Sequence, residues 1–163
     1  MIYSIATVCL SGTLRQKIEA ISKAGFRGIE IFENDLITHN GSVHEIRSML
    51  DDHGLEVVTY QPFRDFEGLP APYRHKAFDR AERKFDLMEE LGTDLLMVCS
   101  SVSPHALGGF SALQMTSTNW ANARQNVTCA WLMKHSVGEN TCAITAILGK
   151  SCAAPIMKTW AYA

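Results

Sequence analysis

The residues best placed to do chemistry in this 163-residue chain stand just after three short apolar runs. Glu33 follows the run 28–32, Gln61 and Arg64 follow the run 55–60, and Ser100 follows the run 95–99. A carboxylate accepts hydrogen bonds, a guanidinium fits a carboxylate in a fork, and amide or hydroxyl groups hydrogen-bond to ligand hydroxyls. We therefore expect Glu33, Gln61, Arg64 and Ser100 to bind a substrate.

Each of these residues also has an ordinary structural explanation. Glu33 could be a surface loop residue, Arg64 could form a salt bridge with Asp65 or Glu67, and Ser100 could cap the next helix. The position of Arg64 favours a functional role if the apolar runs are parallel strands of a barrel, because the loops after such strands converge on the catalytic face. For Glu33 the two explanations stay equally open, and for Ser100 the helix cap is favoured.

A strand and helix alternate along the first hundred residues. Three times an amphipathic segment ends in a glycine, and a short apolar run follows it. Spacings of three or four between apolar residues predict the helices, and glycine is the usual residue at a helix C-terminus. The first strand is expected to include Ile5 and Val8, and Ser11 or Thr13 is expected to cap the helix that ends at Gly25. The later strands are expected at 28–32, 55–60 and 95–99, and the helices between them are expected to open at Ser42 and to follow the polar loop 61–72.

The apolar runs indicate a parallel sheet. They are almost continuous in aliphatic and β-branched residues, as in strands covered on both faces, and the segments between them are long enough for crossover helices. No G-x-G-x-x-G motif follows the first run, where the sequence reads TVCLSG, so a dinucleotide-binding sheet is disfavoured. The sequence predicts an α/β fold of the parallel (β/α) TIM-barrel type, incomplete, with about four β/α units and an irregular C-terminal tail.

The composition changes after residue 109. Aspartate is absent from the segment 110–163, and all 3 tryptophans of the chain lie there. No alternation of strand, glycine and helix continues through this segment, and a complete barrel of eight units needs about 250 residues. We therefore expect residues 1–109 to form the N-terminal half of a barrel and residues 110–163 to form a tail of a different kind.

The overall composition narrows the function classes. The formal net charge is -2, so no basic surface is expected to attract nucleic acid or an anionic membrane. The 5 cysteines form no C-x-x-C pair, and the first residues lack the pattern of a secretion signal. The 6 histidines show no metal-ligand spacing. These features predict a soluble cytoplasmic protein.

Several strings resemble one enzyme family. IFENDL at 31–36, QPFRDFEG at 61–68, the opening SIATVCLSGTL and the segment RAERKFDLMEELGTDL are similar to bacterial 3-dehydroshikimate dehydratases, which have a xylose isomerase-like barrel. The resemblance covers residues 1 to about 109. It implies a lyase that converts 3-dehydroshikimate to protocatechuate and water with a divalent metal such as Mg²⁺, Mn²⁺ or Co²⁺. A sugar phosphate isomerase or epimerase of the same barrel family is the alternative.

The resemblance also implies that the metal ligands come from the second half of the barrel, beginning with the glutamate of a YEA segment. This chain has no such segment, and we expect no metal ligand among its residues. Two hypotheses stay open, an active lyase and a non-catalytic fragment, and the second is physically favoured. A half-barrel leaves strand edges unpaired, which predicts self-association through them.

The genetic code suggests an origin for the tail. When each codon takes the last base of one residue and the first two bases of the next, Met115/Thr116 must give aspartate and Met133/Lys134 must give glutamate, while Asn119 to Ala121 must give leucine and glycine. With permissible codons elsewhere, residues 112–135 become AADDFYELGERAAKRDLRVAYEA. The hypothesis is a one-base frame change near residues 108–110.

Overall fold

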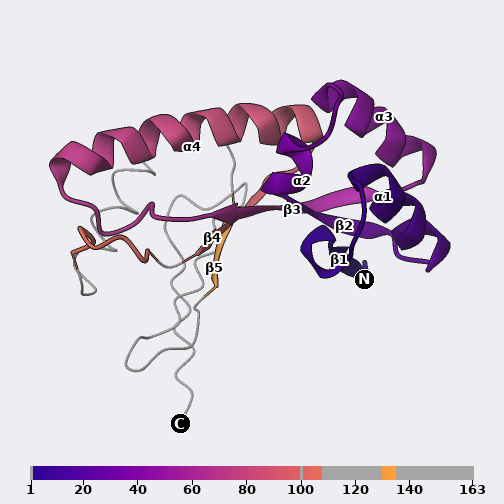
Figure 1. The fold of residues 1–163 in the computed structure, drawn as a ribbon, viewed down its shortest axis with the longest axis horizontal. Coiled ribbons are helices and arrows are strands. Elements are labelled where there is room, and N and C mark those ends of the chain that lie inside the picture. Colours follow the sequence, from indigo (N-terminus) through magenta and orange to yellow (C-terminus); the bar gives the residue numbers. More distant parts are fainter. Residues whose placement is uncertain (1, 100, 108–129, 135–163) are drawn as a thin grey trace, which may run out of the picture. The chain divides into compact units, whose positions relative to one another are not determined.

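The computed structural model describes residues 2–99, 101–107 and 130–134 of the chain (Figure 1). The described helices and strands follow in the order β1 (Ser4–Ala6), the 3₁₀ helix η1 (Thr7–Cys9), α1 (Leu14–Lys23), β2 (Gly28–Phe32), α2 (Glu33–Ile37), α3 (Val43–Asp52), β3 (Glu56–Phe63), α4 (Ala71–Leu91), β4 (Leu95–Cys99) and β5 (Ala130–Lys134). They belong to two compact units. Unit 1 comprises Met1–Pro62 and Phe85–Leu95, and unit 2 comprises Phe63–Lys84 and the described residues from Leu96 onward.

Unit 1 is built on three parallel strands. β1 pairs with β2 and β2 pairs with β3, and in the register of these pairs Ile5 lies opposite Ile29 and Ile31 lies opposite Tyr60. The strands therefore lie side by side in the order of the chain, and a helix occupies each crossover, as parallel pairing requires. The fully buried side chains of this unit come from both strands and helices, and the largest include Ile18, Ile21, Ile29, Ile31, Ile46 and Leu50.

The ends of the first two long helices follow directly from the sequence. Thr13 caps α1 and Ser42 caps α3, each in a capping box with the glutamine or glutamate three residues later. After these helices, Gly25 and Gly54 take φ values of 85° and 62°, which glycine adopts without the steric cost of a side chain. Both boundaries agree with the predicted ones, and Thr13 rather than Ser11 is the first cap.

Gly28 opens β2 at a point where the neighbouring strands leave no room for a side chain. A Cβ atom at this position would lie 2.7 Å from Val58 Cγ2 and 2.9 Å from Ser4 Cβ. Glycine at the start of β2 thus leaves room for the side chains of β1 and β3 that lie on either side of it.

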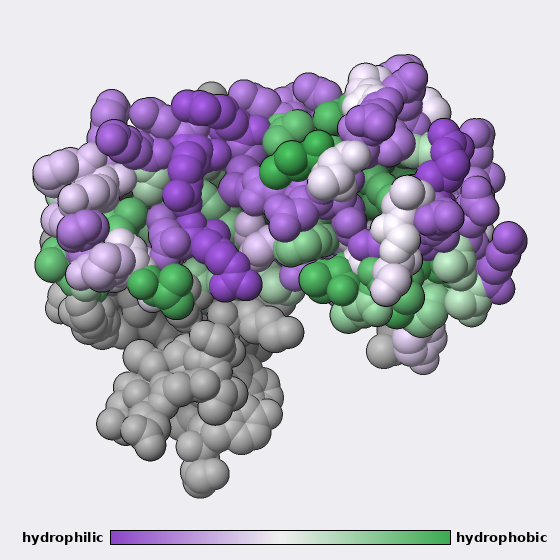
Figure 2. Space-filling model, viewed as in Figure 1, coloured by the Kyte–Doolittle hydropathy of each residue, from purple (hydrophilic) through white to green (hydrophobic). Residues whose placement is uncertain are grey.

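Unit 2 contains an aromatic cluster and the strand pair β4 and β5. The ring centroids of Phe63 and Phe66 are 5.0 Å apart, and Phe66 meets Phe78 edge to face at 5.6 Å. β4 lies next to β5 in the sheet. The exposed positions of α4 are mostly charged, and they include Asp79, Arg80, Arg83, Asp86, Glu89 and Glu90. Hydrophilic residues predominate along the side of this helix that Figure 2 shows.

The structure confirms the predicted fold class, and it corrects several details. β2 and β4 have the predicted bounds, but the first strand ends at Ala6, so Val8 lies in η1 and is 52% exposed. The third strand continues through Gln61 to Phe63, where a loop was predicted. A short helix, α2, occupies the predicted loop after β2.

β5 lies within residues 110–163, where the sequence predicts irregular structure, and the rest of that tail lies outside the described residues. No helix in the described ranges is long and apolar enough to cross a membrane.

Candidate functional site

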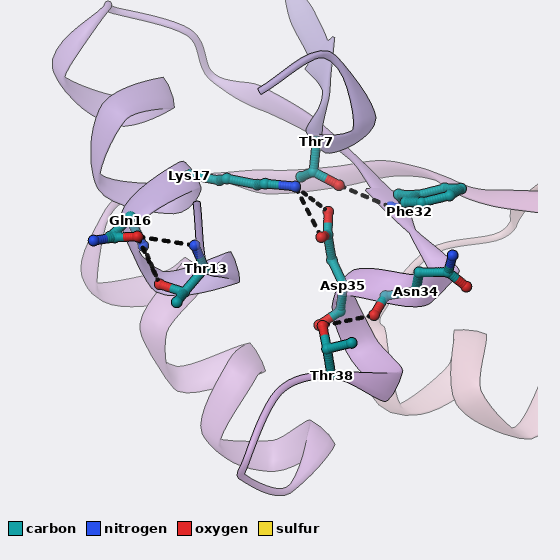
Figure 3. Close-up of polar contacts among 8 residues, drawn as sticks. All are labelled: Thr7, Thr13, Gln16, Lys17, Phe32, Asn34, Asp35 and Thr38. Carbon is teal, nitrogen blue, oxygen red and sulfur yellow. Dashed lines mark hydrogen bonds and ion pairs between the residues drawn. The ribbon is translucent and has the colours of Figure 1, made fainter. Parts of the chain in front are cut away.

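Glu33 is the first residue of α2 and follows β2 directly. The preceding residue, Phe32, is the N-cap of α2, and its backbone N–H donates to Thr7 Oγ1 over 3.0 Å (Figure 3). Thr7 is fully buried and is the first residue of η1, directly after β1. The loop after the first strand therefore fixes the point at which α2, and with it Glu33, begins.

A second contact holds the same short helix. Lys17 on α1 reaches Asp35 on α2, with its Nζ atom 2.8 Å and 2.9 Å from the two carboxylate oxygens (Figure 3). Only 7% of the Lys17 side chain and 12% of the Asp35 side chain are exposed. A helix of five residues is too short to be stable alone, so α2 depends on this ion pair and on Thr7 for its position.

Glu33 is half-buried and accepts a hydrogen bond from Tyr60, whose hydroxyl lies 3.2 Å from Glu33 Oε1. Tyr60 is 1% exposed. Burial, and then the negative charge of Glu33, raise the pKa of the Tyr60 hydroxyl. Tyr60 therefore stays a hydrogen-bond donor at neutral pH. The functional role predicted for Glu33 stays a prediction, but the residue belongs to a polar network and is not an isolated surface group.

Gln61 lies in β3, directly after Tyr60. Its Nε2 atom donates to Glu30 Oε2 over 3.1 Å, and Ser4 Oγ donates to the other oxygen, Glu30 Oε1, over 3.2 Å. Glu30 thus joins β1, β2 and β3 through side chains. We call Ser4, Glu30 and Gln61 the three-strand polar cluster.

Arg64 lies in unit 2 and is exposed. Its backbone carbonyl accepts a hydrogen bond from the Arg80 guanidinium. Its own guanidinium forms no ion pair with any residue that the structure describes, so the alternative of a salt bridge with Asp65 or Glu67 is not formed there. The predicted role of Arg64 in binding a carboxylate stays a prediction.

Asp65 and Glu67 instead hold the segment after β4. Asp65 Oδ1 accepts from Val102 N over 2.8 Å and from Ser101 Oγ over 3.2 Å, and Glu67 Oε1 accepts from Ser101 N. Glu67 is 7% exposed, and burial raises the pKa of its carboxyl. Its second oxygen, Oε2, has no hydrogen-bond partner among the described residues. These two carboxylates tie the loop after β3 to the loop after β4.

The fourth predicted residue, Ser100, lies outside the described residues. The sequence analysis did not identify Ser4, Glu30, Thr7 or Lys17. A signal for Glu30 was present, because it is a charged residue between the isoleucines of a strand, where alternation places it on the opposite face. Lys17 gave no comparable signal, since a lysine on an amphipathic helix is normally exposed.

The described residues do not bring together a metal site. No three histidine, cysteine, aspartate or glutamate side chains lie close enough to hold an ion in the part of the chain that the structure covers. A divalent cation such as Mg²⁺ or Mn²⁺ needs several oxygen ligands at about 2.0–2.2 Å. The three-strand polar cluster offers one carboxylate, so it does not fit such an ion.

Parallel neighbouring strands, helical crossovers and polar side chains at the carboxyl ends define a protein of the β/α-barrel class. The family model described as "Xylose isomerase-like TIM barrel" matches residues 18–138, and the chain belongs to this family.

Among curated proteins, the chain is 59% identical over 105 residues to a 3-dehydroshikimate dehydratase of Pseudomonas aeruginosa and 60% identical over 105 residues to one of Pseudomonas putida. The matched segment is 64% of this chain in both cases, but 17% of the first protein and 16% of the second. The chain thus spans about a sixth of the length of these relatives.

Solved structures agree on the fold. A "xylose isomerase-like TIM barrel/4-hydroxyphenylpyruvate dioxygenase fusion protein" aligns with a TM-score of 0.79 at 48% identity, over 83% of this chain and 22% of that chain. The IolI protein, solved with a bound zinc atom, aligns with a TM-score of 0.70 at 12% identity, over 83% of this chain and 51% of that chain. A divalent metal therefore occurs among structures of this fold.

Proposed function

We propose that residues 1–109 are the N-terminal half of the barrel of a 3-dehydroshikimate dehydratase, a lyase that converts 3-dehydroshikimate to protocatechuate and water. The observation that carries the proposal is the identity of 59% to 60% with two such enzymes over 105 residues. A matched segment of 105 residues is long enough to include the loops after the strands as well as the core, and in this fold those loops carry the substrate site.

The proposed substrate matches the chemistry of the predicted residues. 3-Dehydroshikimate carries a carboxylate, a ketone and hydroxyl groups. The exposed guanidinium of Arg64 suits the carboxylate, and Gln61 and Ser100 suit the hydroxyls. Glu33, hydrogen-bonded to the buried Tyr60 hydroxyl, is a carboxylate held in a defined direction near the end of β2.

Dehydration also needs a base beside the ketone and stabilisation of the enolate that forms. A divalent metal would stabilise the enolate by polarising the ketone. The described residues do not fit such an ion, so no step of the reaction is assigned to a metal on this chain. We therefore propose that the 163-residue chain by itself does not turn over substrate. It contributes strands β1 to β4 and their loops to a site whose cation ligands lie on other strands.

The frame change is proposed as the origin of residues 110–163. The codon arithmetic supports it, because the regrouped codons read as a charged helix followed by the strand-like letters VAYE, as expected of a further β/α unit. Sequencing the gene tests this proposal, because early stop codons in the shifted frame would contradict it.

The activity is tested with the purified 163-residue chain, 3-dehydroshikimate and added Mn²⁺, by the absorbance of protocatechuate. The proposal predicts no product and no detectable retention of Mn²⁺ after gel filtration. Product formed at a rate proportional to chain concentration would show that the chain is a complete enzyme. The matched control is the Pseudomonas putida dehydratase in the same buffer, which must form protocatechuate.

A further inference from the structure

We infer that Glu30 is a positioning residue, whose carboxylate holds the side-chain amide of Gln61 so that the amide oxygen Oε1 accepts a hydrogen bond from a hydroxyl group of the ligand. The identity of the ligand as 3-dehydroshikimate rests on the proposed function. The position of the amide does not, and the two parts are tested separately.

The three-strand polar cluster lies on one face of the unit 1 sheet. In β2, Glu30 stands between Ile29 and Ile31, which are both fully buried, so its side chain points to the opposite face. Glu30 lies opposite Ala6 of β1 and opposite Thr59 of β3. Ser4 is two residues before Ala6 and Gln61 is two residues after Thr59, so both lie on the same face of the sheet as Glu30. The carboxylate therefore reaches its two partners diagonally, one on each neighbouring strand.

The charge of Glu30 decides which way the Gln61 amide faces. A carboxylate only accepts hydrogen bonds, so the group 3.1 Å from Glu30 Oε2 must be the NH₂ and not the carbonyl oxygen of the amide. Gln61 Oε1 then points away from Glu30. No described residue donates a hydrogen bond to this oxygen, and Gln61 is half-buried. An oriented acceptor of this kind selects a donor, and a hydroxyl group is the neutral donor that a hydroxylated ligand offers.

The same carboxylate disfavours an anion at this position. Glu30 forms no ion pair with any residue in the described ranges, so its negative charge is balanced only by the hydrogen bonds from Ser4 and Gln61. A carboxylate or phosphate group of a ligand would be repelled by it. The hydroxyl-bearing part of the ligand therefore faces the three-strand polar cluster, and its anionic part binds elsewhere.

Two substitutions separate positioning from a merely structural role. In Glu30→Gln, the new amide oxygen can still accept from Gln61 Nε2 and the new NH₂ can donate to Ser4 Oγ, so the direction of the Gln61 amide is kept without the charge. In Glu30→Leu, both hydrogen bonds are lost while the side chain keeps a similar volume. Circular dichroism establishes that each variant is folded.

The test is ¹⁵N NMR of the full chain, with the Gln61 side-chain signals assigned by their loss in Gln61→Glu. We expect exchange of the Gln61 NH₂ protons with water to rise roughly tenfold in Glu30→Leu, as for loss of one hydrogen bond to a charged group, and to stay within about twofold of the wild type in Glu30→Gln. Equal exchange in the wild type and Glu30→Leu would overturn the inference. If Glu30→Leu is unfolded, the Glu30→Gln result decides, because exchange as fast as in a free glutamine would contradict the retained hydrogen bond.

Added 3-dehydroshikimate tests the ligand part. We expect it to shift the Gln61 side-chain signals in the wild type and in Glu30→Gln, and we expect inorganic phosphate to shift them only in Glu30→Gln. Shifts elsewhere in the chain without a shift at Gln61 would contradict the assigned acceptor. An absence of any shift with 3-dehydroshikimate would count against substrate binding by this chain and so against the proposed function, while the exchange comparison would still decide the role of Glu30.

Discussion

Replacing Lys17 by methionine should destabilise unit 1 by about 3 kcal/mol, the usual lower range for breaking a buried ion pair from one side. The side chains of Lys17 and Asp35 are 7% and 12% exposed, and both carboxylate oxygens of Asp35 lie within 2.9 Å of Lys17 Nζ. Methionine keeps the apolar stem packed but leaves a carboxylate without its cation in a site that excludes most water.

Urea unfolding followed by circular dichroism measures this loss. With a slope of roughly 2 kcal/mol per molar urea, the midpoint should fall by about 1.5 M. The matched control is Asp51→Ala, which removes the Arg47–Asp51 pair; its side chains are 33% and 56% exposed, so we expect a change of no more than about 0.5 kcal/mol. Because self-association would raise the midpoint, each curve is repeated at two protein concentrations.

The double variant Lys17→Met with Asp35→Leu separates pairing from packing. Removing both charges should restore part of the lost stability, since no unpaired ion is left. The reasoning is refuted if Lys17→Met lowers the free energy of unfolding by no more than Asp51→Ala does. It is also refuted if the double variant loses more stability than the sum of the losses in Lys17→Met and in Asp35→Leu. Either result would mean that Asp35 is well solvated and that α2 is held by other contacts.

Three further outcomes are expected. Thr7→Val should cost about 1–3 kcal/mol, because the Phe32 N–H would lose its buried acceptor, whereas Thr7→Ser should be close to the wild type in the same urea assay. Folding raises the pKa of the Glu67 carboxyl above its usual 4.5, so the folded protein binds a proton there more tightly than the unfolded chain does. The stability that this proton contributes is present at low pH and is lost as the pH rises above 4.5. In Glu67→Gln, urea unfolding measured across this pH range should show a smaller decline in stability. Size-exclusion chromatography should show concentration-dependent self-association through β1, next to which Tyr3 is 68% exposed, and a monomer at every concentration would contradict this.

The regular parts of the fold could be predicted because each has a local signal. β2 and β4 are short aliphatic runs, and the caps Thr13 and Ser42 mark where helices begin. α2 could not be predicted, since five residues are too few to show a helical period and its N-cap, Phe32, has no side-chain hydrogen bond. β3 was predicted too short because Gln61 and Pro62 have the composition of a loop, and only one apolar residue, Phe63, follows them in the strand.

The sequence could single out candidate polar residues but not their connections. Glu33 and Gln61 became candidates because they follow apolar runs, a property of the sequence alone, and their role in binding a substrate stays a prediction. Their partners, Tyr60 and Glu30, depend on the register between strands, which includes a shift between Ile29 and Glu30. No spacing along one strand encodes that register, so the direction in which each polar group points became clear only from the structure.

The central proposal is that residues 1–109 supply the first four strands and their loops to the barrel of a 3-dehydroshikimate dehydratase. The most direct measurement is the rate of protocatechuate formation by the Pseudomonas aeruginosa enzyme in which the matched 105-residue segment is replaced by the corresponding residues of this chain. We expect this hybrid to form protocatechuate at a rate within about tenfold of the parent enzyme, a difference of about 1.4 kcal/mol in activation free energy. A folded hybrid that retains its metal but forms no protocatechuate would contradict the proposal.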